Sequence, residues 1–434
     1  MRKMKNRGIA WVEECPEHWE QHPVYYYFSE RKAPNVLLSE TNLLSLSYGK
    51  IKRKDINTNG GLLPASFNTY NIIEEGDIII RPTDLQNDKR SLRTALSTEH
   101  GIITSAYIAL RPKQKVNSAY FHYLLHAYDV QKVFYNMGNG VRQGLNYSEF
   151  SKLKLLAPPI DEQKSIVSFL DSKCSDIDAL VNDIQAEIST LEEYKKSVIT
   201  EAVTKGLNPD AKMKDSGVAW VGECPEHWKI LKIRDSINKI ESGVSVNAAS
   251  YPAGDNEIGV LKTSCVSKYI FDARENKAVN KNEESRVSCP VRKGCIIVSR
   301  MNTPDLVGAC GYVAEEVNGI YLPDRLWQVH VKTTYSAQYV TYYLMSHIAR
   351  SYYASIAVGT STTMQNISQI EFGCMFFCVP EIEEQQAIAD YLDAKCDEIA
   401  ATIAEKQKQL TTLEEYKKSL IYEYVTGKKE VPAL

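Results

Sequence analysis

Residues 160–206 read IDEQKSIVSFLDSKCSDIDALVNDIQAEISTLEEYKKSVITEAVTKG, and residues 382–427 read IEEQQAIADYLDAKCDEIAATIAEKQKQLTTLEEYKKSLIYEYVTG. The block LEEYKKS occurs in both, at Leu191–Ser197 and at Leu413–Ser419. Neither stretch contains an internal proline or glycine, the residues that most often break a helix. The sequence therefore predicts two long helices that are near copies of each other.

Each copy carries one apolar seam. Apolar residues recur at alternating steps of four and three, which is the spacing of a coiled coil. The seam residues are Leu170, Cys174, Ile177, Val181, Ile184, Ile188, Leu191 and Val198 in the first copy, and Leu392, Cys396, Ile399, Ile403, Leu410, Leu413 and Leu420 in the second. A helix of about 40 residues is roughly 60 Å long, and a seam of that length needs a partner. We expect the two copies to pair with each other, with Lys406 at a seam position fixing the register at some cost in stability.

Charge is unevenly distributed along the chain. The 434 residues, enough for two or three domains, carry a formal net charge of −3. Acidic residues outnumber basic ones in the two repeats, whereas the balance is reversed in residues 21–157 and 229–379. Two mildly basic segments favour contact with a polyanion, although an ordinary mixed surface explains the charge equally well.

Targeting and redox signals point to the cytoplasm. The N-terminal stretch MRKMKNRGIAWVEECPEHW lacks the apolar core of a signal peptide, and no run of 18 apolar residues predicts a membrane span. The ten cysteines are scattered along the chain, which favours reduced and mostly buried thiols. We therefore expect a cytoplasmic protein.

A second repeat precedes each basic segment. Gly8–Trp19 reads GIAWVEECPEHW, and Gly217–Trp228 reads GVAWVGECPEHW. Proline fixes the backbone and tryptophan buries a large area, so we interpret this repeat as a docking strap. His18 and His227 lie inside the straps, but the motif offers no further ligands. A packed structural role is therefore favoured over metal binding for both histidines.

The two basic segments share an order of elements but little sequence. In the first segment we expect a turn at Gly76-Asp77 leading into a strand within Ile72–Arg81, strands in Gly101–Leu110 and Lys152–Pro159, and a helix in Ser118–Tyr135. In the second we expect the same turn and strand in Val291–Arg300, a strand in Gly319–Val331, a helix in Tyr335–Ile356 and a closing stretch Gly373–Pro380. The predicted fold class is α+β, with two mixed α/β lobes separated by two long antiparallel coiled-coil helices in a pseudo-twofold internal repeat. The predicted domains are 1–159, 160–206, 207–381 and 382–434.

No catalytic motif is recognisable. The chain lacks a GxxxxGK[ST] phosphate loop, and it lacks the glycine-rich cofactor loop and Asn-Pro-Pro-aromatic site that a DNA methyltransferase would need. His122 and His126 lie one helical turn apart, as in zinc sites, but without the glutamate of a zinc hydrolase. Two packed ring side chains are favoured there. The sequence therefore argues against an enzyme and predicts no metal site.

Polar loops in the lobes are better candidates for a binding site. Arginine pairs with guanine, asparagine and glutamine pair with adenine, and lysine or arginine neutralises phosphate. The candidate DNA-binding residues are Lys50, Lys52, Arg53, Lys54, Arg81, Gln86, Asn87, Lys89, Arg90, Arg93, Arg142 and Gln143 in the first lobe, and Arg300, Asn302, Thr303 and Gln365 in the second. A solvated loop is the alternative for each cluster, but equivalent placement in both lobes favours DNA contact.

The arrangement of repeats resembles the specificity subunit of a type I restriction–modification system. The resemblance rests on the tandem AWVxECPEHW straps, on PPIDEQ at Pro158–Gln163 and PEIEEQ at Pro380–Gln385, and on the twin LEEYKKS helices. It covers nearly the whole chain. The two lobes differ from each other, as the two target-recognition domains of this family usually do, so no base contact is transferred residue by residue.

The resemblance implies a non-catalytic subunit that recognises an asymmetric, bipartite sequence in double-stranded DNA. It also implies two modification subunits, which bind S-adenosylmethionine and methylate adenine, and restriction subunits, which use ATP and Mg. No cofactor is expected on this chain itself. Antiparallel helices would place the lobes at opposite ends of a ruler between two half-sites, about one turn of DNA apart.

Two other classes of protein remain open. The chain could be a coiled-coil scaffold whose lobes bind protein, and an absence of salt-dependent DNA binding would favour that alternative. A fused methyltransferase would need a cofactor loop, which the sequence does not contain.

Overall fold

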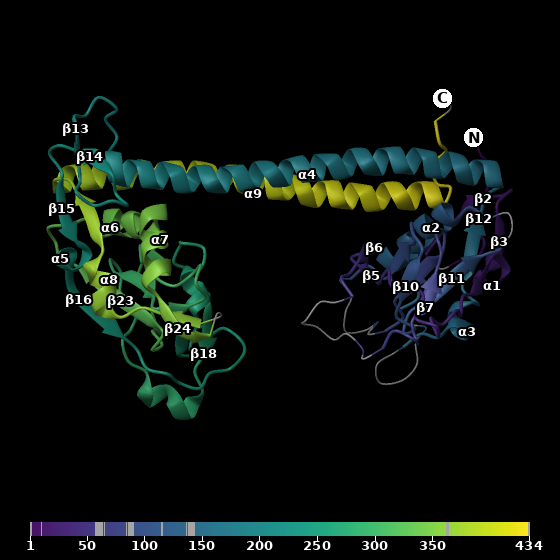
Figure 1. The fold of residues 1–434 in the computed structure, drawn as a ribbon, viewed down its shortest axis with the longest axis horizontal. Coiled ribbons are helices and arrows are strands. Elements are labelled where there is room, and N and C mark those ends of the chain that lie inside the picture. Colours follow the sequence, from purple (N-terminus) through teal and green to yellow (C-terminus); the bar gives the residue numbers. More distant parts are fainter. Residues whose placement is uncertain are drawn as a thin grey trace. The chain divides into compact units, whose positions relative to one another are not determined.

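The computed structural model describes residues 2–9, 11–56, 64, 66–83, 85, 91–113, 116–135, 137, 144–361 and 364–432. Contacts between residues divide the chain into two compact units, both drawn in Figure 1. Unit 1 comprises Met1–Gln185 and Gln407–Leu434, and unit 2 comprises Ala186–Lys406. Each unit therefore contains one lobe together with part of each long helix. The predicted domain bounds, in contrast, had treated each lobe and each helix as separate domains.

Both long helices are present as predicted. They are α4 (Ile160–Lys205) and α9 (Ile382–Val425), and every predicted seam residue is buried or half-buried. In unit 1, Lys417 Nζ donates to Asp178 Oδ1 at 2.6 Å, and in unit 2, Lys406 forms an ion pair with Glu187. The residue numbers rise along one helix while they fall along the other, so the helices pair antiparallel.

Lobe 1, residues 2–159, is built on a four-stranded antiparallel sheet in the order β4-β11-β8-β9. Its elements are β1 (Met4–Lys5), β2 (Cys15–Pro16), β3 (Glu20–Pro23), α1 (Val24–Tyr27), β4 (Phe28–Glu30), β5 (Leu44–Ser47), β6 (Lys50–Arg53), β7 (Asn71–Ile73), β8 (Ile78–Ile80), β9 (Thr94–Leu96), β10 (Gly101–Ile103), β11 (Ile108–Pro112), α2 (Ser118–Val130), α3 (Tyr147–Phe150) and β12 (Lys154–Ala157). Helix α2 packs against β9, and Leu124 shares a core with Ile80 and Leu110 of the sheet.

Lobe 2, residues 207–381, has an equivalent antiparallel sheet in the order β16-β23-β19-β21. Its elements are β13 (Met213–Asp215), β14 (Glu223–Pro225), β15 (Lys229–Lys232), α5 (Ile233–Ser236), β16 (Ile237–Ser242), β17 (Gly259–Leu261), η1 (Thr263–Val266), β18 (Asn276–Ala278), η2 (Lys281–Arg286), β19 (Ile296–Ser299), β20 (Met301–Asn302), β21 (Cys310–Tyr312), β22 (Ile320–Tyr321), β23 (Leu326–Val331), α6 (Ala337–Met345), α7 (His347–Ile356), β24 (Val358–Ser361), β25 (Met364–Asn366), α8 (Gln369–Cys374) and β26 (Phe376–Val379). The two lobes therefore share one topology, which confirms the predicted α+β fold with an internal repeat.

Several predicted elements are interrupted or end early. The strand expected in Gly319–Val331 is split into β22 and β23. The strand expected in Gly101–Leu110 is split into β10 and β11 by a turn in which Tyr107 N donates to Thr104 O at 3.1 Å. The helix expected in Tyr335–Ile356 is broken at Ser346, whose hydroxyl accepts from Ala349 N and so starts α7 as an N-cap. Helix α2 ends before Tyr135 because Lys132 takes a left-handed conformation, with φ of 58°.

Each strap is clamped to the first turn of a long helix. In unit 1, Trp19 Nε1 donates to Glu162 Oε1 at 3.1 Å, and His18 Nε2 lies 2.9 Å from Glu162 Oε2. In unit 2, the same two distances join Trp228 and His227 to Glu384. Both strap histidines thus contact a glutamate of their helix, but their side chains are 49% and 57% exposed, so the packed position predicted for them was wrong. The other strap tryptophan of unit 2, Trp220, is 47% exposed and does not anchor its strap by burial.

In both units, the glutamine next to the clamp glutamate and a tyrosine of the lobe make further matching contacts. Gln163 Nε2 donates to Pro158 O at 2.9 Å, and Gln385 Nε2 makes the same bond to Pro380 O. The hydroxyl of Tyr120 in α2 donates to the carbonyl of Val425 at the end of α9, at 3.1 Å. In unit 2, Tyr339 of α6 donates in the same way to Val203, near the end of α4, at 3.2 Å. The repeated sequence thus encodes a repeated set of contacts between lobe and helices.

Candidate nucleic-acid interface

The first basic cluster of lobe 1 lies on a hairpin formed by β5 and β6. Tyr48 and Gly49 make its two-residue turn with φ of 48° and 75°, and left-handed angles at both positions are typical of tight hairpins. Four of the predicted site residues lie on this hairpin or directly after it, all exposed: Lys50, Lys52, Arg53 and Lys54. The structure therefore gathers these cations on or beside one hairpin.

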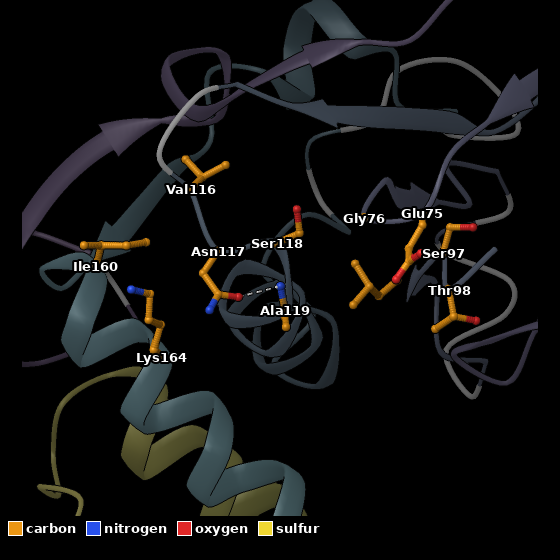
Figure 2. A pocket seen from close by; sticks show the side chains of 11 residues that line it. Glu75, Gly76, Ser97, Thr98, Val116, Asn117, Ser118, Ala119, Ile160 and Lys164 are labelled. Carbon is orange, nitrogen blue, oxygen red and sulfur yellow. Dashed lines mark hydrogen bonds between the residues drawn. The ribbon is translucent and has the colours of Figure 1, made fainter. Parts of the chain in front are cut away.

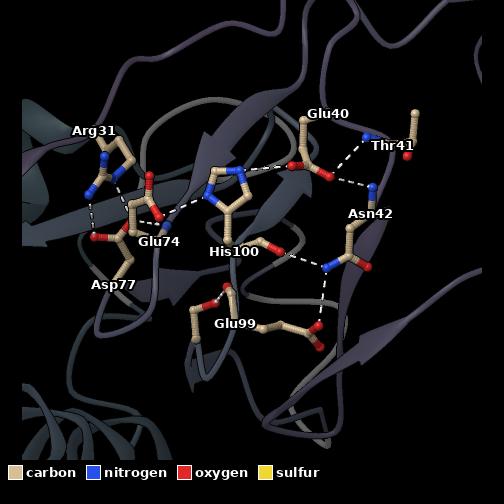
Figure 3. A network of polar contacts seen from close by, with 9 residues as sticks. Arg31, Glu40, Thr41, Asn42, Glu74, Asp77, Glu99 and His100 are labelled. Atoms are coloured by element: carbon tan, nitrogen blue, oxygen red, sulfur yellow. Dashed lines mark hydrogen bonds and ion pairs between the residues drawn. The ribbon is translucent and has the colours of Figure 1, made fainter.

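A network of polar contacts fixes the base of the hairpin. Figure 3 shows the part of this network around Asn42, Glu99 and His100. Arg53 Nε donates to Glu99 Oε2 at 2.6 Å, and Asn42 Nδ2 donates to the same oxygen at 3.1 Å. The hydrogen bond from Arg53 lowers the pKa of Glu99 most, followed by that from Asn42. Asn42 also donates to the carbonyl of His100 at 2.6 Å. The hairpin is thus held against the turn between β9 and β10.

The centre of this network is acidic. His100 lies between two carboxylates, with Nδ1 2.8 Å from Glu74 Oε2 and Nε2 2.8 Å from Glu40 Oε2 (Figure 3). The hydrogen bond with Glu74 is the largest of the interactions that raise the pKa of His100. Arg31 pairs with the buried Asp77, and burial raises the pKa of that carboxyl. The network supports the lobe and does not resemble a phosphate site.

Arg93 is a buried residue of the lobe core. Its side chain has 0% exposure, its Nε donates to Tyr135 Oη at 3.1 Å, and Nη1 donates to the carbonyl of Thr83. Its backbone N–H donates to the carboxylate of Asp129. In this position the guanidinium does not reach a DNA base, so the prediction of a direct contact by Arg93 was wrong. Nothing in the local sequence indicated this, because arginine is rarely buried completely.

The remaining predicted residues of lobe 1 have mixed outcomes. Arg81 directly follows β8, is half-buried, and donates its backbone N–H to Arg93 O at 2.8 Å. Six predicted residues lie outside the described residues, and their role stays a prediction: Gln86, Asn87, Lys89, Arg90, Arg142 and Gln143.

In lobe 2, the structure brings the four predicted residues together. Strands β20, β25 and β24 form a small antiparallel sheet in which Asn302 lies directly opposite Gln365. Arg300 precedes β20, and its Nε donates to Asn366 Oδ1 at 3.3 Å. Thr303 follows β20 and is exposed. Sequence reasoning thus found one spatial cluster among residues that lie far apart in the chain.

The two lobes place these segments in the same way. In lobe 2, Ile367 N donates to Arg300 O at 3.1 Å, which joins the segment after β25 to the residue after β19. In lobe 1, Leu145 N donates to Pro82 O at 3.0 Å, which joins the equivalent segments. The equivalence that the sequence predicted between the two polar loops therefore has a structural basis.

A pocket in unit 1 offers no reactive chemistry. It has a volume of about 400 Å³ and lies between the turn at Gly76 and the first residues of α2 and α4 (Figure 2). Its walls carry one acidic and one basic side chain, Glu75 and Lys164, and Lys164 Nζ lies 3.2 Å from Asp161 Oδ1. The other lining groups are small, aliphatic, hydroxyl or amide side chains.

The described residues do not form a metal site, and a Cys–His–Glu trio in lobe 2 lacks a reactive thiolate. Within the described residues, no group of three His, Cys, Asp or Glu side chains could hold a metal ion. Burial lowers the pKa of His122 and of His126 to about 4, so both are neutral ring side chains at pH 7. In lobe 2, Cys295 Sγ lies 3.4 Å from His330 Nδ1, and His330 Nε2 lies 2.6 Å from Glu241 Oε2. Burial raises the pKa of the Cys295 thiol to about 11, so this trio lacks the thiolate that a nucleophile needs.

Sequence reasoning missed part of the hairpin. Ser45, Ser47 and Tyr48 belong to it, and none was predicted as a site residue. The signal was present, because LSLS alternates apolar and polar residues and Tyr-Gly follows as a turn. The prediction had included only the basic residues of this stretch.

Comparisons with known proteins agree with this geometry. Residues 45–190 and 225–412 match the family model "Type I restriction modification DNA specificity domain". The chain belongs to this family. It is 25% identical over 373 residues to the type I restriction enzyme MjaVIII specificity subunit of Methanocaldococcus jannaschii, covering 84% of this chain and 81% of that protein. It is 26% identical to the putative MjaX specificity subunit of the same organism, covering 75% of this chain and 71% of that protein.

A solved structure gives the same fold. A chain from a study of complex assembly and conformational transition of the type I R-M system matches with a TM-score of 0.68 and 15% identity, covering 96% of this chain and 99% of that chain. The family match confirms the expected function as the DNA sequence-recognition subunit of a type I system, which entails DNA and partner subunits. No helix among the described residues is long and apolar enough to cross a membrane.

Proposed function

We propose that each lobe of this specificity subunit reads one half of an asymmetric, bipartite target in double-stranded DNA. The proposal rests on a contrast between the two halves of the chain. The straps and long helices form a frame that is the same for both lobes, whereas the exposed polar elements of the lobes differ. Both lobes have the same strand order and the same clamps to α4 and α9. Their exposed polar elements differ, with a basic hairpin in lobe 1 and the small sheet of β20, β25 and β24 in lobe 2.

The helices would set the distance between the two half-sites and dock the modification subunits. Each helix begins in one unit and ends in the other without interruption. An antiparallel pair gives both lobes an equivalent place on the frame, so two copies of one modification subunit could bind in equivalent ways. Antiparallel pairing with ion pairs such as Lys417–Asp178 supports a defined register.

The chain itself would be non-catalytic. The trio around Cys295 has no reactive thiolate, and the described residues offer no metal cluster. Methylation of adenine would fall to two modification subunits that bind S-adenosylmethionine, and restriction subunits would use ATP and Mg. A flipped target base would then enter a pocket of the modification subunit.

Methylome sequencing of a host with and without this gene tests the proposal, in a strain that carries the partner genes. We expect methylated adenines in a motif of two short specified halves separated by unspecified bases, present only with the gene. A protein-binding scaffold, the alternative function, would leave the methylome unchanged, and the purified assembly would lack salt-dependent DNA binding. Three exposed aliphatic side chains in lobe 1, Val36, Leu37 and Leu38, are the observation that most favours a protein partner there.

A further inference from the structure

We propose that the β5–β6 hairpin of lobe 1 lies flat in the major groove, where its outer face reads base edges. That face consists of Ser45, Ser47, Lys50 and Lys52. The inference rests on the proposed function, in which lobe 1 reads one half of the target, and it assigns that reading to one element. It also assigns a binding role to two serines and a tyrosine that charge alone does not single out.

The hairpin has one covered face and one free face. The cross-strand pairs are Leu44 with Arg53, Ser45 with Lys52, Leu46 with Ile51, and Ser47 with Lys50. Since side chains alternate between the faces of a strand, the Leu46–Ile51 pair shares a face with Leu44, and the two Ser–Lys pairs share the other. The leucines are buried in a cluster with Ile79 of the central sheet. The face that carries the serines and lysines is therefore directed away from the lobe core.

The outer face has the chemistry of a groove reader. Lysine donates to the N7 and O6 acceptors of guanine, and serine can donate to or accept from any base. Serine is small, so the backbone of β5 can approach the base edges closely while the two lysines extend from β6. Residues 44–54 contain no aspartate or glutamate, so no carboxylate of the hairpin itself opposes the approach of phosphate groups.

The dimensions also fit. Two paired strands lie about 4.8 Å apart, and a two-stranded ribbon fits a major groove about 12 Å wide. A ribbon with one face on its own protein can enter the groove only with the other face towards the bases. The tip residue Tyr48 is 79% exposed and would then meet the sugar–phosphate edge of the groove.

The hairpin is held in shape before DNA binds. Gly49 adopts a left-handed φ of 75°, and a Cβ on it would lie 3.1 Å from the side chain of Leu92, so the turn requires glycine. At the other end, Lys54 N donates to Leu43 O at 2.8 Å, and Arg53 is fixed to Glu99. A preformed ribbon loses less conformational entropy on binding than a flexible loop.

Lobe 2 has the same strands at the corresponding place, but the connection between them differs. There the antiparallel strands β17 and β18 are connected by residues 262–275, which include η1, instead of a two-residue turn. The inference therefore concerns one half of the target only, and it predicts that the two halves are read by different kinds of element.

The test uses the full chain assembled with its modification subunits. Affinity is measured by fluorescence anisotropy on duplexes that carry the methylated motif and on duplexes with each base pair of the motif changed in turn. The variants are Lys50→Gln, Lys52→Gln and Ser47→Tyr, which change exposed or half-exposed positions and suit a β-strand. The control is Lys154→Gln, an exposed lysine of lobe 1 on β12.

We expect Lys50→Gln or Lys52→Gln to weaken binding to the motif about 10-fold or more and to abolish discrimination at one or two adjacent positions of one half. Ser47→Tyr should give the same pattern by holding the ribbon away from the bases. Discrimination in the other half, and binding by Lys154→Gln, should be unchanged.

Two results would overturn the inference. The first is uniform weakening on all duplexes with a salt slope lower by about 0.9 per lysine, which would mean phosphate contacts only. The second is unchanged binding by all three hairpin variants. The proposed function fails separately, if the unaltered assembly does not distinguish its motif from a scrambled duplex.

Discussion

Arg93 and Arg81 come from the same polar stretch of sequence, but the folded lobe gives them different surroundings. Arg93 is enclosed by Thr83, Asp129 and Tyr135, whereas Arg81 is half-buried at the end of β8. The sequence predicted both as DNA contacts because it shows their charge but not how far each side chain is buried. Burial of an arginine depends on partners that lie far away in the chain, and no local pattern announces it.

Replacing Arg93 by methionine should lower the free energy of unfolding by about 2–4 kcal/mol, because it leaves the polar groups around the guanidinium without their partner. Arg81→Ala should change stability by less than about 1 kcal/mol but weaken DNA binding by about 1–3 kcal/mol if Arg81 contacts a base. Urea unfolding of the full chain and anisotropy on the methylated motif measure the two effects. Normal stability of the Arg93 variant would contradict the buried position.

Two histidines of α2 should make lobe 1 sensitive to acid. Burial lowers the pKa of His122 and of His126 to about 4, whereas both titrate near 6.5 in the unfolded chain. Below pH 6.5 the unfolded state therefore binds more protons than the folded state, and stability falls as pH falls towards 4. We expect a loss of roughly 2 kcal/mol per histidine between pH 7.5 and pH 5.

Urea unfolding at several pH values measures this loss, and the double variant His122→Gln/His126→Gln should reduce it. His100 acts in the opposite direction, because its carboxylate partners raise its pKa, and its contribution is lost as pH rises. Comparison with the double variant separates the two. An equal acid sensitivity of both proteins would argue against neutral histidines in the core.

Among the elements, the long helices were the most predictable and the lobe strands the least. A sustained seam without proline or glycine determines α4 and α9 nearly to the residue. The seam residue Lys406 is indeed paired across the helices with Glu187, although its effect on register stays a prediction. The split of β10 from β11 depends on a local turn. The hairpin of β5 and β6 was not predicted, because the interpretation of this stretch rested on its basic residues alone.

The clamps between strap and helix should contribute to stability in both units, and in unit 1 Glu162 also forms an ion pair with Arg2. Glu162→Ala removes the acceptor of Trp19 and His18, and Glu384→Ala removes the acceptor of Trp228 and His227. Each change should destabilise its own unit by about 1–3 kcal/mol, because it leaves a buried indole N–H without a partner.

Hydrogen exchange measured on peptides of each unit reports where the stability is lost. Asp161→Ala is the matched control, since Asp161 is a neighbouring exposed acid of the same helical turn. Loss in both units from either change, or an equal loss from Asp161→Ala, would contradict the clamp.

Across the full chain, the sequence predicts both the internal repeat and the common order of elements in the two lobes. The straps and helices repeat almost letter for letter, whereas the lobes keep one strand order with little identity. A fold tolerates wide change in sequence when the apolar pattern and volume of its core are kept. Sequence therefore predicts the shared architecture of the lobes and the matching place of their polar loops, but not the different connections between β5 and β6 and between β17 and β18.

Deleting one heptad from each helix tests the proposed ruler. Removal of Val181–Glu187 together with Ile403–Gln409 preserves both seams and shortens the pair by about 10 Å. About three base pairs of spacing and roughly a quarter turn of twist would be lost. We expect methylation to disappear at the native motif and any residual activity to move to a shorter spacer. Methylation of the native motif by a folded, assembled deletion variant would contradict the ruler.

Exchange of one lobe is the decisive experiment on independent reading by the two lobes. Residues 21–157 are replaced by the corresponding lobe of another member of the family, and the methylated motif is then determined by sequencing of the host DNA. We expect one half of the motif to change to that of the donor, while the other half and the spacer stay as they were. A motif in which both halves change, or in which neither changes, would show that the lobes do not read DNA independently on a constant frame.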